Sequence, residues 1–289
     1  MYKRISEYGV VGDLHTVALI GLDGSVDWLC YPYIDSPSVF GALLDEHKGG
    51  CFAVQPAGAY DAAAHYLERT NILVTRFRTR QGTAVLSDFM PVGFREQPTG
   101  EEAAPQALIR RLEVISGAMT VHCLFQPRFD YARAETRVSA TQGGVLAESD
   151  EWSMALACTH PLEAEADQAR GQWELQAGDT VWLRLGSTQS GQCREEDTDV
   201  QDPEQSRQLL EETTGFWRTW LSTSETGRSL PDHHYQDMTQ RSALVLKLLY
   251  YGPTGTLAAA ATTSLPEVVG GERNWDYRFT WIRDAAFTL

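Results

Sequence analysis

Along the first two thirds of the chain, hydrophobic and polar residues alternate with a period of two. The clearest run alternates between one face with Ile72, Val74, Arg76 and Arg78 and another with Leu73, Thr75 and Phe77. Successive side chains of a strand point to opposite faces, so this period predicts β-strands. Turn-forming residues separate the runs, at Asp23-Gly24, Gln81-Gly82, Ser116-Gly117, Gly143-Gly144 and Ala177-Gly178-Asp179. Strands joined in this way predict a large antiparallel β-sandwich over residues 1–195.

Two of these turns carry specific expectations. Asp-Gly is favoured at the centre of a two-residue type I′ hairpin turn, where both residues need positive φ, so we expect such a turn at Asp23-Gly24. The run LIRRLEVISGAMTVHCLFQPRF holds two apolar stretches around Ser116-Gly117. This arrangement predicts a hairpin that reverses direction at that pair.

The pattern changes after the acidic stretch CREEDTDVQDPEQ, residues 193–205, which we interpret as a linker. A helix is expected from about Pro203, because proline is tolerated in a first turn and Asp202 can cap it. Its aromatic residues Phe216, Trp217 and Trp220 share a side with Leu209, which favours core packing. A second helix is expected in DHHYQDMTQRSALVLKLLYY, ending at Gly252-Pro253.

Composition limits the classes of partner. The 289 residues carry a formal net charge of −15, which argues against nucleic acid and against an anionic membrane surface. The five cysteines are scattered and form no C-x-x-C pair, so we expect reduced thiols, no metal site, no cofactor and a cytoplasmic location. The longest apolar run, LAAAA at 257–261, is too short to cross a bilayer.

Charged and aromatic residues are concentrated near the end of the sequence, in GGERNWDYRFTWIRDAAFTL, residues 270–289. Flat rings stack on the C–H faces of a pyranose, and guanidinium or carboxylate groups form paired hydrogen bonds to vicinal hydroxyls. The segment interleaves both kinds, with Trp275, Tyr277, Phe279 and Trp281 among Asp276, Arg278, Arg283 and Asp284. The composition fits a sugar site, and equally fits an amphipathic segment with local Asp–Arg pairs.

Longer motifs favour the sugar site. The segment TTSLPEVVGGERNWDYRFTWIRDAAFTL resembles the opening of the catalytic domain of glycoside hydrolase family 15, the glucoamylase-type enzymes. The start, GDLHTVALIGLDGSVDWLCYPYIDSPSVFGALLD, resembles the N-terminal segment of prokaryotic members, as do QPRFDYAR and FWRTWL further on. The resemblance extends in order along essentially the whole chain. It departs from the usual pattern at Tyr33-Ile34 and at Ala261.

The resemblance implies an architecture and a set of binding residues. It implies a β-sandwich over 1–195, a helical linker over 196–250, and over 251–289 the start of an (α/α)6 catalytic barrel, whose remainder would be the partner of this chain. Arg283 and Asp284 match the adjacent pair that binds the hydroxyls of the terminal glucose. Tyr277 and Trp281 match aromatic residues that line the same subsite.

The resemblance also implies an activity, inverting hydrolysis of terminal α-linked glucose. Inversion needs two carboxyl groups, one acid and one base, which in the family are glutamates further along the barrel. No matching motif occurs here, so we expect no catalytic residue in this chain and no activity from it alone. The main expectation is a glucan 1,4-α-glucosidase acting on α-glucan oligosaccharides. The alternatives are a trehalase of the same family and a non-catalytic module that binds glycans or braces a barrel.

The loop WLCYPYIDSPSVF, Trp28–Phe40, carries an open question of its own. Trp28, Tyr31 and Asp35 are unusual residues for the end of a hairpin. They fit a loop that helps to shape the sugar site, and they fit better a loop that closes one end of the sandwich.

Overall fold

The computed structural model describes residues 2–93, 105–186, 193–198, 203–223, 235–268 and 270–288. Its strands are β1 Tyr8–Gly12, β2 Val17–Gly21, β3 Ser25–Cys30, β4 Ser38–Phe40, β5 Cys51–Pro56, β6 Asp61–Tyr66, β7 Leu73–Arg78, β8 Gly82–Phe89, β9 Ala107–Gln126, β10 Arg137–Ala140, β11 Gly144–Glu148, β12 Ser153–Cys158, β13 Glu163–Glu165, β14 Gln168–Gln176, β15 Thr180–Gly186, β16 Tyr250–Tyr251 and β17 Thr256–Leu257. Its helical elements are η1 Ile5–Glu7, α1 Phe129–Ala132, η2 Glu195–Thr198, α2 Pro203–Thr223, α3 Gln236–Leu248 and α4 Ile282–Thr288.

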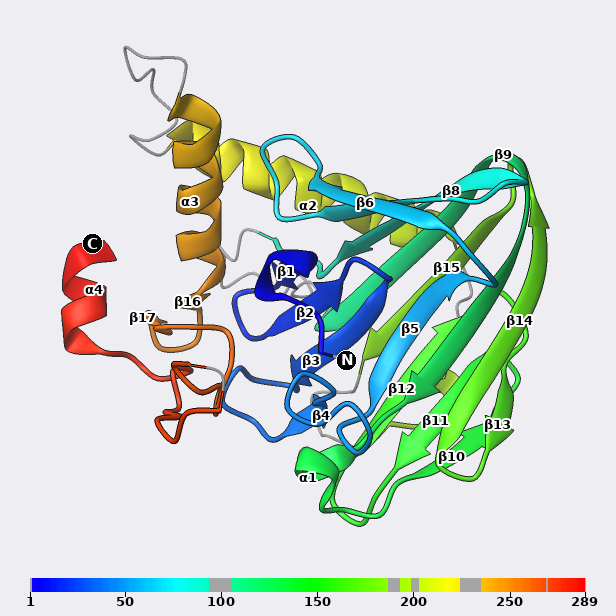
Figure 1. Cartoon of the computed structure of the whole chain (residues 1–289), viewed down its shortest axis with the longest axis horizontal. Helices are drawn as coiled ribbons and strands as arrows, with labels where there is room; N and C mark the ends of the chain where they lie inside the picture. The colour runs from blue at the N-terminus through cyan, green and yellow to red at the C-terminus, as the bar shows by residue number, and fades with distance from the viewer. Residues whose placement is uncertain are drawn as a thin grey trace.

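The predicted mainly β fold with an antiparallel sandwich is confirmed (Figure 1). One layer pairs β1, β2, β3, β5, β9, β14 and β13 in that order, with β4 added to β3. The other layer runs β6, β7, β8, β9, β15, β12, β11 and β10. The strands β1 to β15 all pair antiparallel. As predicted, β7 buries Leu73, Thr75 and Phe77 and exposes Arg76 and Arg78.

Strand β9 belongs to both layers, and the hairpin expected at Ser116-Gly117 is therefore wrong. The chain runs on from residue 107 to 126; its first half pairs with β8 and β15, and its second half with β5 and β14. Gly117 has a φ of 71°, a conformation that glycine adopts without a steric penalty, and lies where the partners change. Two apolar stretches around a glycine fit a bent strand as well as a hairpin, so the sequence pattern could not distinguish them.

Most of the other predicted turns are confirmed. Gln81-Gly82 and Gly143-Gly144 each connect two paired antiparallel strands. At Asp23-Gly24 the chain also turns back, from β2 to β3, but only Gly24 has positive φ, at 79°, so the turn is not type I′. The turn around Gly178 leads from β14 in one layer to β15 in the other. Strand β14 pairs with the second half of β9, and β15 pairs with its first half.

A buried ion pair lies between the two layers. Arg110 on β9 and Asp88 on β8 are both fully buried, with Nε 2.7 Å from a carboxylate oxygen. The same guanidinium donates to the carbonyls of Phe52 and Gly24 in the opposite layer, each at 2.7 Å. Buried charge is tolerated when it is paired and hydrogen-bonded in this way. Arg110 therefore connects the layers through polar contacts inside an otherwise apolar core.

Helix α2 begins where the sequence predicted, and two of its aromatic residues pack in a core as expected. It begins at Pro203, and Phe216 and Trp217 are buried in a cluster with Leu244 and Leu248 of α3. Near its start, Leu209 packs on the outward side chains Ile109 and Trp182 of the second layer. The capping role of Asp202 and linker residues 199–202 fall outside the described residues.

Helix α3 is held by contacts with the segment around the end of β6. Asn71 donates to the carbonyl of Leu244 at 2.9 Å, and Arg241 stacks on the Tyr66 ring at 3.9 Å. The helix ends at Leu248, earlier than the glycine at 252 predicted, because Tyr250–Tyr251 pair with Thr256–Leu257 as a small hairpin. In the described part of the chain, no helix has the length and apolar character needed to cross a membrane.

Candidate functional site

The predicted site residues lie in the segment that follows β17, beside the start of α4 (Figure 1). The rings of Tyr277 and Trp281 stack, with centroids 5.4 Å apart and planes inclined by 20°. The guanidinium carbon of Arg283 lies 5.9 Å from the centre of the Trp281 ring. Three of the four residues are therefore brought together. Asp284 follows on the backbone of α4, and its side chain falls outside the described part.

Local hydrogen bonds explain this arrangement. The amide of Ala285 donates to the carbonyl of Trp281 at 2.9 Å, which makes Trp281 the residue from which α4 starts. The carboxylate of Asp276 accepts from the amide of Arg278 at 3.1 Å, a local turn typical of aspartate. Tyr277 lies four positions before Trp281, next to that turn, and the two rings meet face to face.

A neighbouring stretch, residues 258–267, supports the backbone of the site. The amides of Ala259 and Ala260 donate to the carbonyls of Phe279 and Tyr277, at 3.2 and 2.8 Å. The amide of Ser264 donates to the carbonyl of Trp275 at 3.1 Å, and Thr263 and Asp276 form an isolated β-bridge. The site is therefore built on two extended segments lying side by side.

Arg278 is the residue whose role the sequence did not reveal. It appears there as one of several charges, whereas in the fold it is only 8% exposed. Its Nε and Nη2 donate to the two oxygens of Asp276 at 2.9 and 2.7 Å. Its Nη1 donates to the carbonyl of Ser36 at 2.8 Å and contacts the Cys30 sulfur at 3.3 Å. The amphipathic alternative thus holds for Asp276 and Arg278, while Tyr277, Trp281 and Arg283 form a separate group.

Two carboxylates near the ring stack, those of Asp276 and Glu267, differ in their exposure and in their hydrogen-bond partners. Burial by itself raises the pKa of Asp276, but the hydrogen bonds and charge of Arg278 outweigh it and hold that pKa below its usual value. An ionised carboxylate with both oxygens bound to a guanidinium is a poor general acid. Glu267 is exposed, and its carboxylate accepts a long hydrogen bond, 3.5 Å, from the Tyr277 hydroxyl.

The loop Trp28–Phe40 covers the end of the sandwich. Trp28 is fully buried and donates its indole N–H to the carbonyl of Ala261 at 2.9 Å, and Tyr31 donates to the carbonyl of Gln106. Asp35 is exposed. Both rings are thus buried and hydrogen-bonded to the protein, which agrees with a loop that closes the sandwich.

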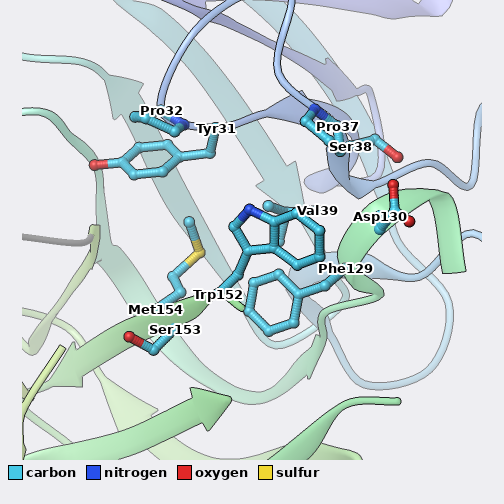
Figure 2. Close-up of a pocket in the computed structure, with 10 residues that line it drawn as sticks. All are labelled: Tyr31, Pro32, Pro37, Ser38, Val39, Phe129, Asp130, Trp152, Ser153 and Met154. Carbon is cyan, nitrogen blue, oxygen red and sulfur yellow. The ribbon is translucent and has the colours of Figure 1, made fainter. Parts of the chain in front are cut away.

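Under this loop lies a small cavity (Figure 2). Tyr31, Phe129 and Trp152 supply its rings, Met154 lies between Tyr31 and Trp152, and the Asp130 carboxylate lies near Ser38 at the edge. Its volume of about 30 Å³ suits one or two water molecules and is too small for a pyranose. The rings around it pack the sandwich end, and the space between them is too small to enclose a sugar.

Known families match this chain in two consecutive parts. Residues 2–208 match the trehalase-like N-terminal family, and residues 233–289 match glycosyl hydrolases family 15. A trehalase of Thermoplasma volcanium is 35% identical over 292 residues, covering 100% of this chain and 44% of that protein. A trehalase of Mycolicibacterium smegmatis is 36% identical over 312 residues, covering 100% and 44%. "Trehalase 1" of Sulfolobus acidocaldarius is 30% identical over 281 residues, covering 96% and 43%.

The chain thus spans less than half the length of the curated relatives it matches. The relatives named here are trehalases, so they support the trehalase alternative better than a glucan 1,4-α-glucosidase. The order of the two matches follows the order of the fold, from the sandwich to the segment that carries Tyr277, Trp281 and Arg283. The chain belongs to the trehalase-like N-terminal family, and its last part matches family 15 of the glycosyl hydrolases.

Proposed function

We propose that this chain forms part of a trehalase of glycoside hydrolase family 15. In the reaction, water attacks one anomeric carbon of trehalose, the glycosidic C–O bond breaks, and two glucose molecules leave. The observation that carries the proposal is the Tyr277–Trp281 stack beside Arg283, in a segment that matches the hydrolase family. The names of the relatives favour trehalose over α-glucan oligosaccharides as the substrate.

Each site residue has a role in this proposal. The open face of the Tyr277–Trp281 stack packs against the apolar face of one glucose unit. The Arg283 guanidinium and the Asp284 carboxylate bind neighbouring hydroxyls, since both groups can form two parallel hydrogen bonds. Asp276 is bound to Arg278, so we assign the acid and the base of an inverting mechanism to residues outside this chain. Accordingly, no residue of this chain is assigned a catalytic role.

The domain organisation belongs to the same proposal. Residues 1–195 form the sandwich, 196–250 the linker helices, and 251–289 the first part of a catalytic barrel that continues in the complete protein. In this arrangement the barrel would cover Leu246 and Ile282, which are 39% and 87% exposed in the described structure. Burial of such side chains is favourable.

The test is the release of glucose from trehalose, maltose and isomaltose, by this chain and by the full-length product of its reading frame. We expect the full-length protein to prefer trehalose and this chain alone to release none. Asp284→Asn in the full-length protein should abolish release, while Asp150→Asn, an exposed sandwich position, should leave it unchanged. Preference for maltose would overturn the substrate. Release by this chain alone would overturn the assignment of catalysis to other residues.

A further inference from the structure

Arg278 links the segment of the site to three separate parts of the sandwich. Besides the Ser36 carbonyl and the Cys30 sulfur, its Nη1 lies 3.4 Å from the carbonyl of Ile34. Its guanidinium carbon lies 6.0 Å from the centre of the Tyr131 ring. These groups come from the end of β3, the loop after it and the turn α1. A single side chain of the site segment thus contacts residues that are distant from one another in the sequence.

The sandwich also holds these acceptors through hydrogen bonds that do not involve Arg278. The amide of Ile34 donates to the carbonyl of His15 at 2.8 Å, which fixes the loop to the turn between β1 and β2. The amide of Tyr33 donates to the hydroxyl of Ser36 at 3.1 Å, which fixes the loop internally. The carbonyls of Ile34 and Ser36 therefore point toward Arg278 as part of a rigid surface.

The Tyr131 ring is presented by unusual backbone. Asp130, Tyr131 and Ala132 have φ of 52°, 57° and 63°, three successive residues other than glycine in the left-handed region. Such residues are strained, and they persist where the surroundings impose them, often at functional sites. The turn is anchored by Phe129, which is buried, and it places the Tyr131 ring against two guanidinium groups, those of Arg133 and Arg278.

On its other side, Arg278 holds the site. Both of its bonds to Asp276 act on the residue that precedes Tyr277. The carbonyl of Tyr277 itself is bound to the amide of Ala260. The backbone of Tyr277 is therefore held on both sides, in a position from which its ring stacks on that of Trp281. A planar guanidinium suits this task, because its donors lie in fixed directions that match a carboxylate on one edge and carbonyls on another.

We infer that Arg278 is a positioning residue: it transmits the rigid geometry of the sandwich loop and the Tyr131 turn to the Tyr277–Trp281 stack. The sandwich would then be needed to shape the glucose subsite and not only to stabilise the protein. The inference rests on the proposed function, in that it takes the stack as the surface that binds glucose.

The test compares three variants in the full-length protein. Arg278→Met keeps the length of the side chain and removes the donors, and Arg278→Lys keeps the charge without the planar geometry. Arg133→Met is the matched control, because Arg133 also lies over Tyr131 but pairs with Asp130 within the same turn. The measurements are kcat and KM on the disaccharide that the unmodified protein hydrolyses fastest, the dissociation constant of D-glucose, and the melting temperature.

We expect Arg278→Met to lower kcat/KM by about 30-fold or more, because small displacements of binding groups are costly in rate. The affinity of Arg278→Met for glucose should fall by about 5-fold or more, and Arg278→Lys should recover part of both losses. In Arg133→Met, kcat/KM and glucose affinity should stay within about 2-fold of the unmodified protein. A purely structural role would lower the melting temperature and leave kcat/KM and glucose affinity within about 3-fold, which would overturn the inference.

Other outcomes remain decisive. If Arg278→Met does not fold, Asp276→Asn takes its place, with an expected loss in kcat/KM of about 10-fold; a change under about 3-fold refutes the inference. If the unmodified protein prefers maltose, the proposed substrate fails while the comparison of variants stands on maltose. If it hydrolyses none of the disaccharides, equal glucose affinity in the unmodified protein and Arg278→Met refutes the positioning role. If it also binds no glucose, both proposals fail.

Discussion

The indole N–H of Trp28 donates to the carbonyl of Ala261 at 2.9 Å, across 233 positions of sequence. Trp28 is a fully buried residue of β3, and Ala261 lies in the stretch that supports the backbone around Tyr277. One hydrogen bond thus connects strand β3 of the sandwich to the segment of the candidate site, in addition to the contacts of Arg278.

Trp28→Phe removes this hydrogen bond and retains most of the ring. We expect a loss of about 1–2 kcal/mol in the free energy of unfolding, since a buried carbonyl is left without its donor. Amide hydrogen exchange should also accelerate in residues 258–264. The matched control is Trp173→Phe, which loses an equivalent bond to the carbonyl of Pro161 within the sandwich. It should destabilise the protein similarly without accelerating exchange in 258–264; equal acceleration in both variants would contradict the proposed connection.

Arg110→Met leaves the Asp88 carboxylate in the core without its partner. We expect a loss of about 3–5 kcal/mol in the free energy of unfolding, measured by chemical denaturation. The double variant Arg110→Met, Asp88→Leu should be more stable than Arg110→Met, because it removes the uncompensated charge. The control Arg111→Met affects a partly exposed pair with Glu113 and should cost at most about 1 kcal/mol. Strict additivity in the double variant would show that the two side chains do not interact.

The pH dependence of stability should show the Asp276–Arg278 pair. Arg278 lowers the pKa of Asp276 against the opposing effect of burial, so folding favours the ionised form. This contribution is fully present above the unfolded-state pKa, about 3.9, and is lost as the pH falls through the lower, folded-state value. The melting temperature of Asp276→Asn should therefore lie below that of the unmodified chain at pH 7, and the difference should shrink below about pH 4. A difference that is constant from pH 7 to pH 3 would exclude this linkage.

The thiols should be inert in the folded chain. Burial raises the pKa of Cys30 and of Cys158, each to about 12, with Arg278 opposing the effect at Cys30. Because the thiolate is the reactive form, both should react with iodoacetamide at pH 8 at least about 100-fold more slowly than in the unfolded chain. Cys51, which is half-buried, serves as the internal comparison and should react first. Peptide mapping by mass spectrometry measures all of them together, and equal rates at Cys30 and Cys51 would count against the buried environment.

The ring stack gives a direct prediction on substrate binding. Trp281→Ala in the full-length protein should raise KM for trehalose by about 10-fold, because it breaks up the ring stack that packs against glucose. Trp281→Phe should keep most of the affinity. Trp275→Ala is the control, since Trp275 is 51% exposed and belongs to the same segment but not to the stack. A larger effect at Trp275 than at Trp281 would place the sugar elsewhere on the segment.

Local features of the sequence determined much of this protein. The structure agrees with the alternation at residues 72–78, with the turns at Gln81-Gly82 and Gly143-Gly144 and with the helix start at the proline at 203. These features have local causes, namely strand pleat, turn-forming residues and a fixed proline φ. The grouping of Tyr277, Trp281 and Arg283 is also local, since at most six positions separate them. Their side chains lie beside one another in the structure, and their role in binding glucose stays a prediction.

The tertiary structure decided what depends on distant contacts. Whether the apolar stretches around Gly117 form a hairpin or one bent strand depends on β5, β8, β14 and β15, which supply the hydrogen-bond partners on each side. Likewise, a sequence cannot show that Arg278 points into the sandwich, because its acceptors at Cys30, Ile34 and Ser36 lie more than 240 positions away. In the sequence, Arg278 and Arg283 are two arginines of the same segment. Only tertiary packing shows that Arg278 is buried and bound to Asp276 and Ser36, whereas Arg283 lies beside the Trp281 ring.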